Sequence, residues 1–127
     1  MIEPRELKFV ADPLAWKPPA GMVVRMPPKI RSKQKLLAIL AQRLKFPPWA
    51  GSNWDALEEL LRDLSWLPDG AVTLIHSDLP FGPGGEHRGT YLAILGEVCR
   101  HWAADKSREF IAVFPATARQ QATKPAV

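Results

Sequence analysis

Residues 47–66 gather four carboxylates and three tryptophans in a stretch of twenty. Three of the acids, Asp55, Glu59 and Asp63, recur at every fourth position, which places them on one side of a helix. Like charges at that spacing repel each other and mildly destabilise a helix. Exposed aromatic rings beside unpaired charge are typical of a protein-binding hot spot. The stretch therefore predicts either a solvated acidic face with its aromatics in the core, or a surface that binds a partner protein.

A helix has to position these acids. Leucines at 57, 60, 61 and 64 make an apolar stripe at helical spacing, and the predicted helix ends near Trp66. Ser52, three residues before Asp55, fits a capping box. In this motif the serine side chain caps the first turn, and the acid accepts a hydrogen bond from the backbone amide of the serine. Asp55 therefore has a structural reason to be there, near the positive end of the helix dipole. Glu59 and Asp63 have no such reason.

Other residues with reactive side chains form no set that would support catalysis. His76 with Asp78, and Glu86 with His87, lack a third spaced ligand, so they predict polar loop residues rather than a metal site. Cys99 lies on the apolar stripe of a predicted helix, as a small core residue would. The run GPGG lacks both the P-loop lysine and the dinucleotide-binding spacing. We expect no enzymatic activity, no metal and no cofactor.

Length and composition predict one small globular domain of 127 residues. A single cysteine allows no internal disulfide, which fits a reducing compartment. The start, MIEPRELKF, does not look like a signal peptide, and no apolar run is long enough to span a bilayer. We therefore expect a cytoplasmic protein without a membrane contact.

Charge is divided unevenly along the chain. Residues 1–54 carry ten Lys or Arg and three Asp or Glu, whereas residues 55–109 carry five and ten. Two surfaces of opposite sign are therefore expected. The basic segment 29–35, KIRSKQK, could contact phosphates. It has no interleaved aromatic residues for base stacking, so we expect weak, non-specific nucleic-acid binding at most.

The order of elements indicates an α/β fold. Helices between strands predict crossover connections and a small, mostly parallel sheet. A short apolar run, LKFV, could add an edge strand before it. Ser32 is the predicted N-cap of the first helix. The expected elements are a strand at 22–26, helices at 32–44 and 52–66, a strand at 71–76, a loop at 78–89, a helix through 91–102 and a strand at 109–114.

The stretch Pro48-Trp49-Ala50-Gly51-Ser52-Asn53-Trp54-Asp55-Ala56-Leu57, followed by Glu59, resembles the barstar family of small intracellular inhibitors of microbial ribonucleases. The family's mark is a proline, one or two aromatics, Gly-x-Asn-x-Asp-Ala-Leu and a second acid on the same helix. A weaker likeness extends over 22–115. It implies a barstar-like domain there, with a three-stranded parallel sheet and helices packed on it. An N-terminal extension (1–21) and a flexible tail (116–127) would flank this domain.

The resemblance also implies a mechanism. In this family the second helix and the preceding loop plug the ribonuclease active site, and carboxylates take the place of RNA phosphates. By position, Asp55 and Glu59 are the two helix acids, Trp49 is the loop aromatic, and Glu97 is the acid on the last helix. The expected partner is a basic ribonuclease, such as a toxin for which this chain is the immunity protein. The expected contact residues are Trp49, Gly51, Asn53, Trp54, Asp55, Glu58, Glu59 and Glu97.

Several positions depart from the family pattern and bear on the identity of the target. Ala50 stands where the family often has a second aromatic, and Ser52 replaces an acid. Glu58 stands where the best-known member has a tryptophan, and Glu59 is one methylene longer than the usual aspartate. Two alternatives stay open: a nucleic-acid-associated module that uses residues 29–35, and an interaction domain that kept the fold without ribonuclease inhibition. Oligomeric state is not predicted.

Overall fold

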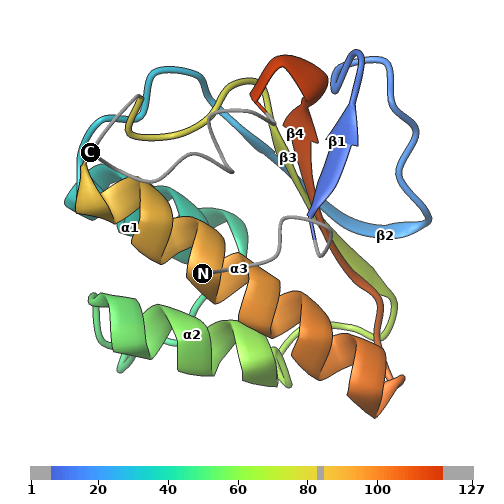
Figure 1. The fold of residues 1–127 in the computed structure, drawn as a ribbon. Helices are drawn as coiled ribbons and strands as arrows, with labels where there is room; N and C mark the ends of the chain where they lie inside the picture. Colours follow the sequence, from blue (N-terminus) through green and yellow to red (C-terminus); the bar gives the residue numbers. More distant parts are fainter. Residues whose placement is uncertain (1–6, 83–84, 119–127) are drawn as a thin grey trace.

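The computed structural model describes residues 7–82 and 85–118. Four parallel strands form one sheet in the order β1-β4-β3-β2 (Figure 1). The strands are β1 (Lys8–Val10), β2 (Gly21–Met26), β3 (Ala71–His76) and β4 (Phe110–Pro115). The helices are α1 (Lys33–Arg43), α2 (Trp54–Asp63) and α3 (Glu86–Asp105), and a short 3-10 helix, Ala116–Ala118, follows β4.

The predicted sheet of three strands is wrong, because the sheet has four. The fourth is β1, which pairs in parallel with β4 from Lys8 beside Val113 to Val10 beside Pro115. This strand covers an edge of β4 whose backbone groups would otherwise lack ladder partners. The expectation that the N-terminal run adds an edge strand is confirmed. The boundaries proposed for the extension stay a prediction, and the tail beyond residue 118 lies outside the described residues.

The connections explain why β3 is buried on both faces. The chain passes from β2 to β3 and from β3 to β4 in the same direction across the sheet, so right-handed crossovers place the helices on one face. The connection from β1 to β2 steps back across the sheet, and segment 11–20 runs on the side away from α2 and α3 (Figure 1). All six residues of β3 are buried. The sheet therefore has a cover on each face.

Buried leucines pack the helices against the sheet. Leu36, Leu37 and Leu40 of α1 are buried, as are Leu57, Leu60 and Leu61 of α2. Two tryptophans tie helices together through backbone carbonyls. Trp102 Nε1 of α3 donates to the carbonyl of Leu61 at 2.8 Å, and Trp66 Nε1 donates to the carbonyl of Leu44 at 2.9 Å. Helix α2 is thus held from α3 on one side and from the end of α1 on the other.

Two local predictions can be compared with the structure. Ser32 caps α1 as expected, since its side chain accepts a hydrogen bond from the Lys35 amide at 3.0 Å. The loop predicted at 78–89 is too long, because α3 already begins at Glu86. Of the described helices, none is both long and apolar enough to cross a membrane.

A buried histidine joins the sheet to α3. His76, at the end of β3, donates from Nδ1 to the Val113 carbonyl at 2.9 Å and accepts at Nε2 from the Tyr91 hydroxyl at 2.7 Å. Its ring also stacks on Phe114, with the centroids 4.1 Å apart. Burial lowers the pKa of His76 to about 4 and raises that of Tyr91. Both side chains are therefore neutral near pH 7.

This burial predicts a pH-dependent stability. The pKa of His76 is 6.5 in its ordinary state and about 4 in the fold, so the unfolded chain binds the extra proton first. The contribution of this site to the free energy of unfolding is therefore largest above pH 6.5. It falls by about 3 kcal/mol in all as the pH drops toward 4. Urea unfolding at pH 7, 6 and 5 should show the loss. His76→Gln should flatten this slope, whereas the control His101→Gln should keep it; equal slopes in both variants would contradict the assignment.

Candidate protein-binding site

Helix α2 begins one residue later than a Ser52 cap would place it. Asn53 is the N-cap, and its side-chain oxygen accepts a hydrogen bond from the Ala56 amide at 2.7 Å. The predicted capping box is therefore wrong, and Asp55 stands at the second helical position. Serine and asparagine are comparable N-caps, so local sequence did not decide between them. The neighbouring residue, Trp54, decides where the cap lies, because its ring enters an aromatic cluster from the first turn of the helix.

Trp54 is half-buried and turned toward the protein. Its ring lies 6.1 Å from that of Phe81, 5.8 Å from that of His87 and 6.4 Å from that of Tyr91, measured between centroids. The Lys33 ammonium nitrogen lies 5.8 Å from the Trp54 ring centroid. Trp54 thus ties the start of α2 to α1, to the loop after β3 and to α3. Its packing therefore positions the start of the helix.

The three acids that recur every fourth residue lie on the solvent side of α2. Asp55, Glu59 and Asp63 are all exposed. Within the described part of the chain, none of these carboxylates has a hydrogen bond or an ion pair. Glu58 differs, because its carboxylate lies 3.4 Å from Arg62 Nη1 one turn later. The charge of Glu58 is thus balanced locally, whereas that of the other three is not.

Trp49 lies beside these acids on the preceding loop and is 78% exposed. The loop turns tightly, with the Ala50 amide bonded to the Pro47 carbonyl at 3.0 Å. Gly51 lets the loop approach α2, because a Cβ there would lie 3.3 Å from that of Ala56. A hollow of about 290 Å³ lies between loop and helix, lined by Trp49, Ala50, Gly51, Ala56, Glu59, Leu60 and Asp63. An exposed indole and two carboxylates thus share one concave surface.

Glu97 is the predicted contact residue that stands apart. It lies on α3, where its side chain is 55% exposed and pairs with Arg100. No contact recorded among the described residues joins it to the acids of α2. The structure therefore brings together Trp49, Gly51, Glu59 and the capping Asn53, and leaves Glu97 as an acid on a second helix.

The basic segment lies next to the start of α2. Lys33, at the first position of α1, sits over the Trp54 ring, one residue from Asp55 in sequence. Lys29 adopts a left-handed backbone, and its amide donates to Asp78 at 2.9 Å. Sequence reasoning missed this adjacency, since no short-range signal links residues 29–35 to residue 54. Nucleic-acid binding by the segment stays a prediction.

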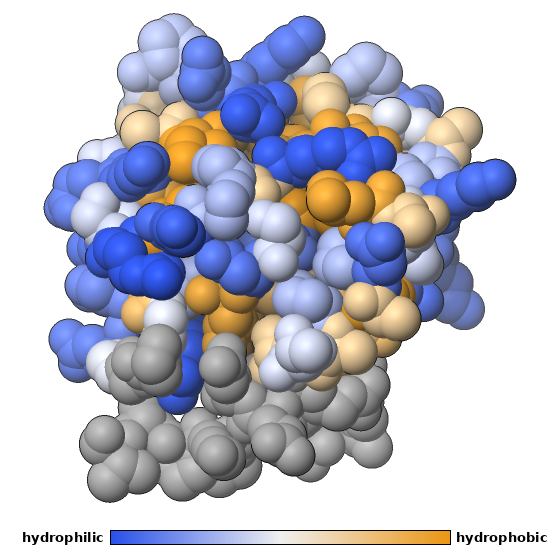
Figure 2. Space-filling model, turned by 90° about the horizontal axis from the view of Figure 1, so that it is seen from above, coloured by the Kyte–Doolittle hydropathy of each residue, from blue (hydrophilic) through white to orange (hydrophobic). Residues whose placement is uncertain are grey.

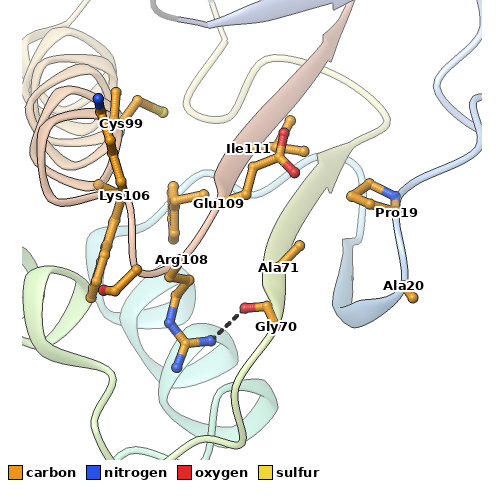
Figure 3. Close-up of a pocket in the computed structure, with 13 residues that line it drawn as sticks. Pro19, Ala20, Gly70, Ala71, Cys99, Lys106, Arg108, Glu109 and Ile111 are labelled. Carbon is orange, nitrogen blue, oxygen red and sulfur yellow. Dashed lines mark hydrogen bonds between the residues drawn. The ribbon is translucent and has the colours of Figure 1, made fainter.

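A further hollow lies on another part of the molecule, and the arginine that lines it already makes hydrogen bonds within the protein. The hollow measures about 700 Å³ and lies at the start of β3 and β4, against the end of α3 (Figure 3). Arg108 donates to the carbonyl of Gly70 at 2.8 Å, as Figure 3 shows, and to that of Pro68 at 3.2 Å. The same guanidinium lies over the Trp102 ring at 5.7 Å. The arginine therefore holds loops in place and is not free for a ligand.

The residues that the structure describes contain no group of three His, Cys, Asp or Glu able to hold a metal ion. Figure 2 views the end of the molecule where β1 and β4 terminate. Hydrophilic side chains interrupt the apolar patches visible there, so this view shows no single broad apolar surface.

The sequence matches the family model described as Barstar (barnase inhibitor) over residues 15–115. No curated protein and no solved structure matches the chain significantly. The match covers every part of the surface described above, from the loop before α2 to the acid on α3.

The cap at Asn53 can be tested against the predicted cap at Ser52. Asn53→Ala removes the side-chain acceptor of the Ala56 amide, so the free energy of unfolding should fall by about 1 kcal/mol. Ser52→Ala is the matched control and should change it by less than about 0.5 kcal/mol, as exposed substitutions usually do. Urea titrations of both variants provide the measurement. The reverse ranking would restore Ser52 as the cap.

Proposed function

This chain belongs to the barstar family, described as barnase inhibitors, and on that premise we propose that it inhibits a basic microbial ribonuclease by inserting α2 into the active-site cleft. The observation that carries the proposal is the unbalanced charge of Asp55, Glu59 and Asp63 beside the exposed Trp49. A ribonuclease toxin, with this chain as its immunity protein, is the proposed target.

Electrostatics explains why such a surface fits a ribonuclease. A cleft that holds RNA presents Arg, Lys and His side chains to phosphate oxygens, and carboxylates can take the place of those oxygens. The acids of α2 repel one another in the free protein. A cationic cleft removes that repulsion and supplies charge-assisted hydrogen bonds. The same field attracts the partner from a distance and raises the association rate.

The residues of the surface have different proposed roles. Glu59 lines the hollow beside Trp49, so its carboxylate would enter the cleft together with the indole. Trp49 offers a large exposed ring, the side-chain type most enriched in hot spots. Asp55 lies at the positive end of the helix dipole and faces solvent. Asn53 and Gly51 hold the loop and helix in register.

Glu58 and Glu97 are proposed as weaker contacts. Each already pairs with an arginine of its own helix, Arg62 and Arg100 respectively. A partner cation would have to displace that arginine, so less free energy is gained. Trp54 is proposed to act by fixing the start of α2, because its ring packs against Phe81 and Tyr91.

The direct test is an inhibition assay. Cleavage of a fluorogenic RNA by barnase and by a panel of other small basic microbial ribonucleases would be measured as this protein is added. We expect stoichiometric inhibition of at least one enzyme, stronger at low than at high salt because the contact is ionic. Failure to inhibit any enzyme of the panel would overturn the proposal.

Two acids of the same helix give a matched comparison. Glu59→Ala should weaken binding to the inhibited ribonuclease by about 2 kcal/mol or more, as truncation of a central hot-spot residue does. Asp63 lies one turn further from the loop, so Asp63→Ala should weaken binding by less. Isothermal titration would measure both affinities. Small and equal losses would mean that α2 carries only a solvated acidic face.

Asp55 separates a structural role from a contact role. Its carboxylate has no hydrogen bond or ion pair within the described residues, so Asp55→Asn should change stability by less than about 1 kcal/mol. Loss of the charge should lower both the affinity and the association rate, and it should weaken their salt dependence. A thermal melt and stopped-flow binding at two salt concentrations would measure these effects. Unchanged binding with lowered stability would make Asp55 a structural residue only.

A further inference from the structure

A buried arginine in the first turn of α3 has no counter-charge. Arg88 is only 5% exposed. The hydrogen bond of its guanidinium group runs from Nη1 to the Gly82 carbonyl at 3.4 Å, which is long for such a bond. Among the residues that the structure describes, no carboxylate forms an ion pair with Arg88. A buried charge is costly unless an opposite charge balances it, so an anion is expected beside this side chain.

A second guanidinium group lies against the same glycine. The Cζ atom of Arg31 is 3.5 Å from the position that a Cβ on Gly82 would take. The Phe81 amide donates to the Ile30 carbonyl at 2.7 Å, so the backbone holds the two segments together. The Arg31 side chain also has no ion pair in the described part of the chain, and its hydrogen bond goes to the Ile30 carbonyl at 3.4 Å. Two positive groups near one residue repel each other unless an anion lies with them.

The carboxylates closest in sequence do not supply this negative charge. Asp78 accepts a hydrogen bond from the Lys29 amide at 2.9 Å. Glu86, at the first position of α3, is exposed, and no ion pair within the described residues joins it to either arginine. The positive charge at Gly82 is therefore not balanced by these two acids.

The start of α3 adds to the positive potential. Gly85 is the N-cap and has a φ of 85°, which favours glycine, so no side chain caps the amides of the first turn. Free amides and the dipole of a 20-residue helix attract an anion to this end. The Nδ1 atom of His87 is buried and has no hydrogen-bond partner in the described structure. The first turn thus holds a second polar side chain whose bonding capacity is not used.

We propose that the start of α3 binds a doubly charged phosphate group, either inorganic phosphate or the terminal phosphate of a nucleotide, through Arg31, Arg88 and the first-turn amides. A phosphate monoester carries about −1.5 to −2 charges at neutral pH, so it balances two guanidinium groups, whereas a carboxylate balances one. Its oxygens accept hydrogen bonds from several sides, and arginine forms paired bonds with them. The site uses none of the acids of α2, so it does not depend on ribonuclease inhibition.

Thermal melts test the site in the whole chain. At constant ionic strength, replacing chloride with millimolar phosphate should raise the melting temperature by about 3 °C or more, because phosphate binds the folded state. Arg88→Met keeps a long side chain without the charge and should abolish this rise. Arg25→Gln changes an exposed arginine of β2 and should keep the full rise as the matched control. An equal rise in all three proteins would overturn the inference.

A second variant and a direct readout guard against an Arg88→Met chain that folds poorly. Arg31 is exposed, so Arg31→Gln should leave the core intact and weaken phosphate binding by about tenfold or more. Binding would be followed by NMR, at the first-turn amides of α3 and at the Nε–H groups of Arg31 and Arg88. We expect saturable shifts of these signals and none at the Nε–H group of Arg25. Absence of saturable shifts in the wild-type chain would contradict the proposed site.

Comparison of ligands identifies the source of the phosphate group. Adenosine 5′-monophosphate carries the same doubly charged group as inorganic phosphate and should shift the same signals. Tighter binding of the nucleotide would assign a nucleotide ligand, and equal affinity would assign phosphate itself. An oligoribonucleotide without terminal phosphates carries only singly charged diesters and should bind more weakly than phosphate. If it binds as tightly, and Arg88→Met does not weaken it, the basic segment 29–35 is a general polyanion surface and the inference is wrong.

Discussion

The orientation of α2 about its long axis decides which of its side chains are buried. The acidic surface of the protein depends on this constraint. Side chains of a helix cannot turn independently of one another, so burying Leu57 and Leu61 and packing Trp54 against the aromatic cluster leaves the acids in solvent. Each buried leucine contributes about 1.5–3 kcal/mol, whereas each like-charge pair one turn apart costs about 0.2–0.5 kcal/mol. The core therefore holds an electrostatically unfavourable face in place in the free protein.

The loop before α2 is held at both ends and borders the acidic face of the helix. It is fixed at one end by the packing of Phe46 on Trp66 and at the other by the Asn53 cap. Between these points Gly51 brings the loop close to Ala56, and Trp49 is left exposed beside Glu59. A change in this short segment alters two concave surfaces together, the hollow beside Glu59 and a cleft against α1. Variation there would therefore reshape both surfaces while the sheet and the helices stay as they are.

Features that depend on residues close in sequence were predictable. Leu57, Leu60 and Leu61 and the acids at every fourth position follow the period of a helix and lie on α2 as expected. The predicted end near Trp66 is wrong, because α2 ends at Asp63 and Leu64 is its left-handed C-cap. The Ser32 cap was correct because its partner, the Lys35 amide, lies three residues away. The parallel α/β architecture followed from the order of strands and helices. The motif at 48–57 indicated the family that the comparison of 15–115 shows.

Other features were decided only by tertiary structure. Strand β1 was indicated by its local apolar run, but its pairing with β4, more than one hundred positions later, could not be read from that run. The choice of Asn53 over Ser52, and the inward turn of Trp54, depend on Phe81 and Tyr91 from the loop after β3 and from α3. The nearness of Lys33 to α2 has the same origin. A sequence pattern gives the faces of each element, whereas burial against distant residues decides which face meets which neighbour.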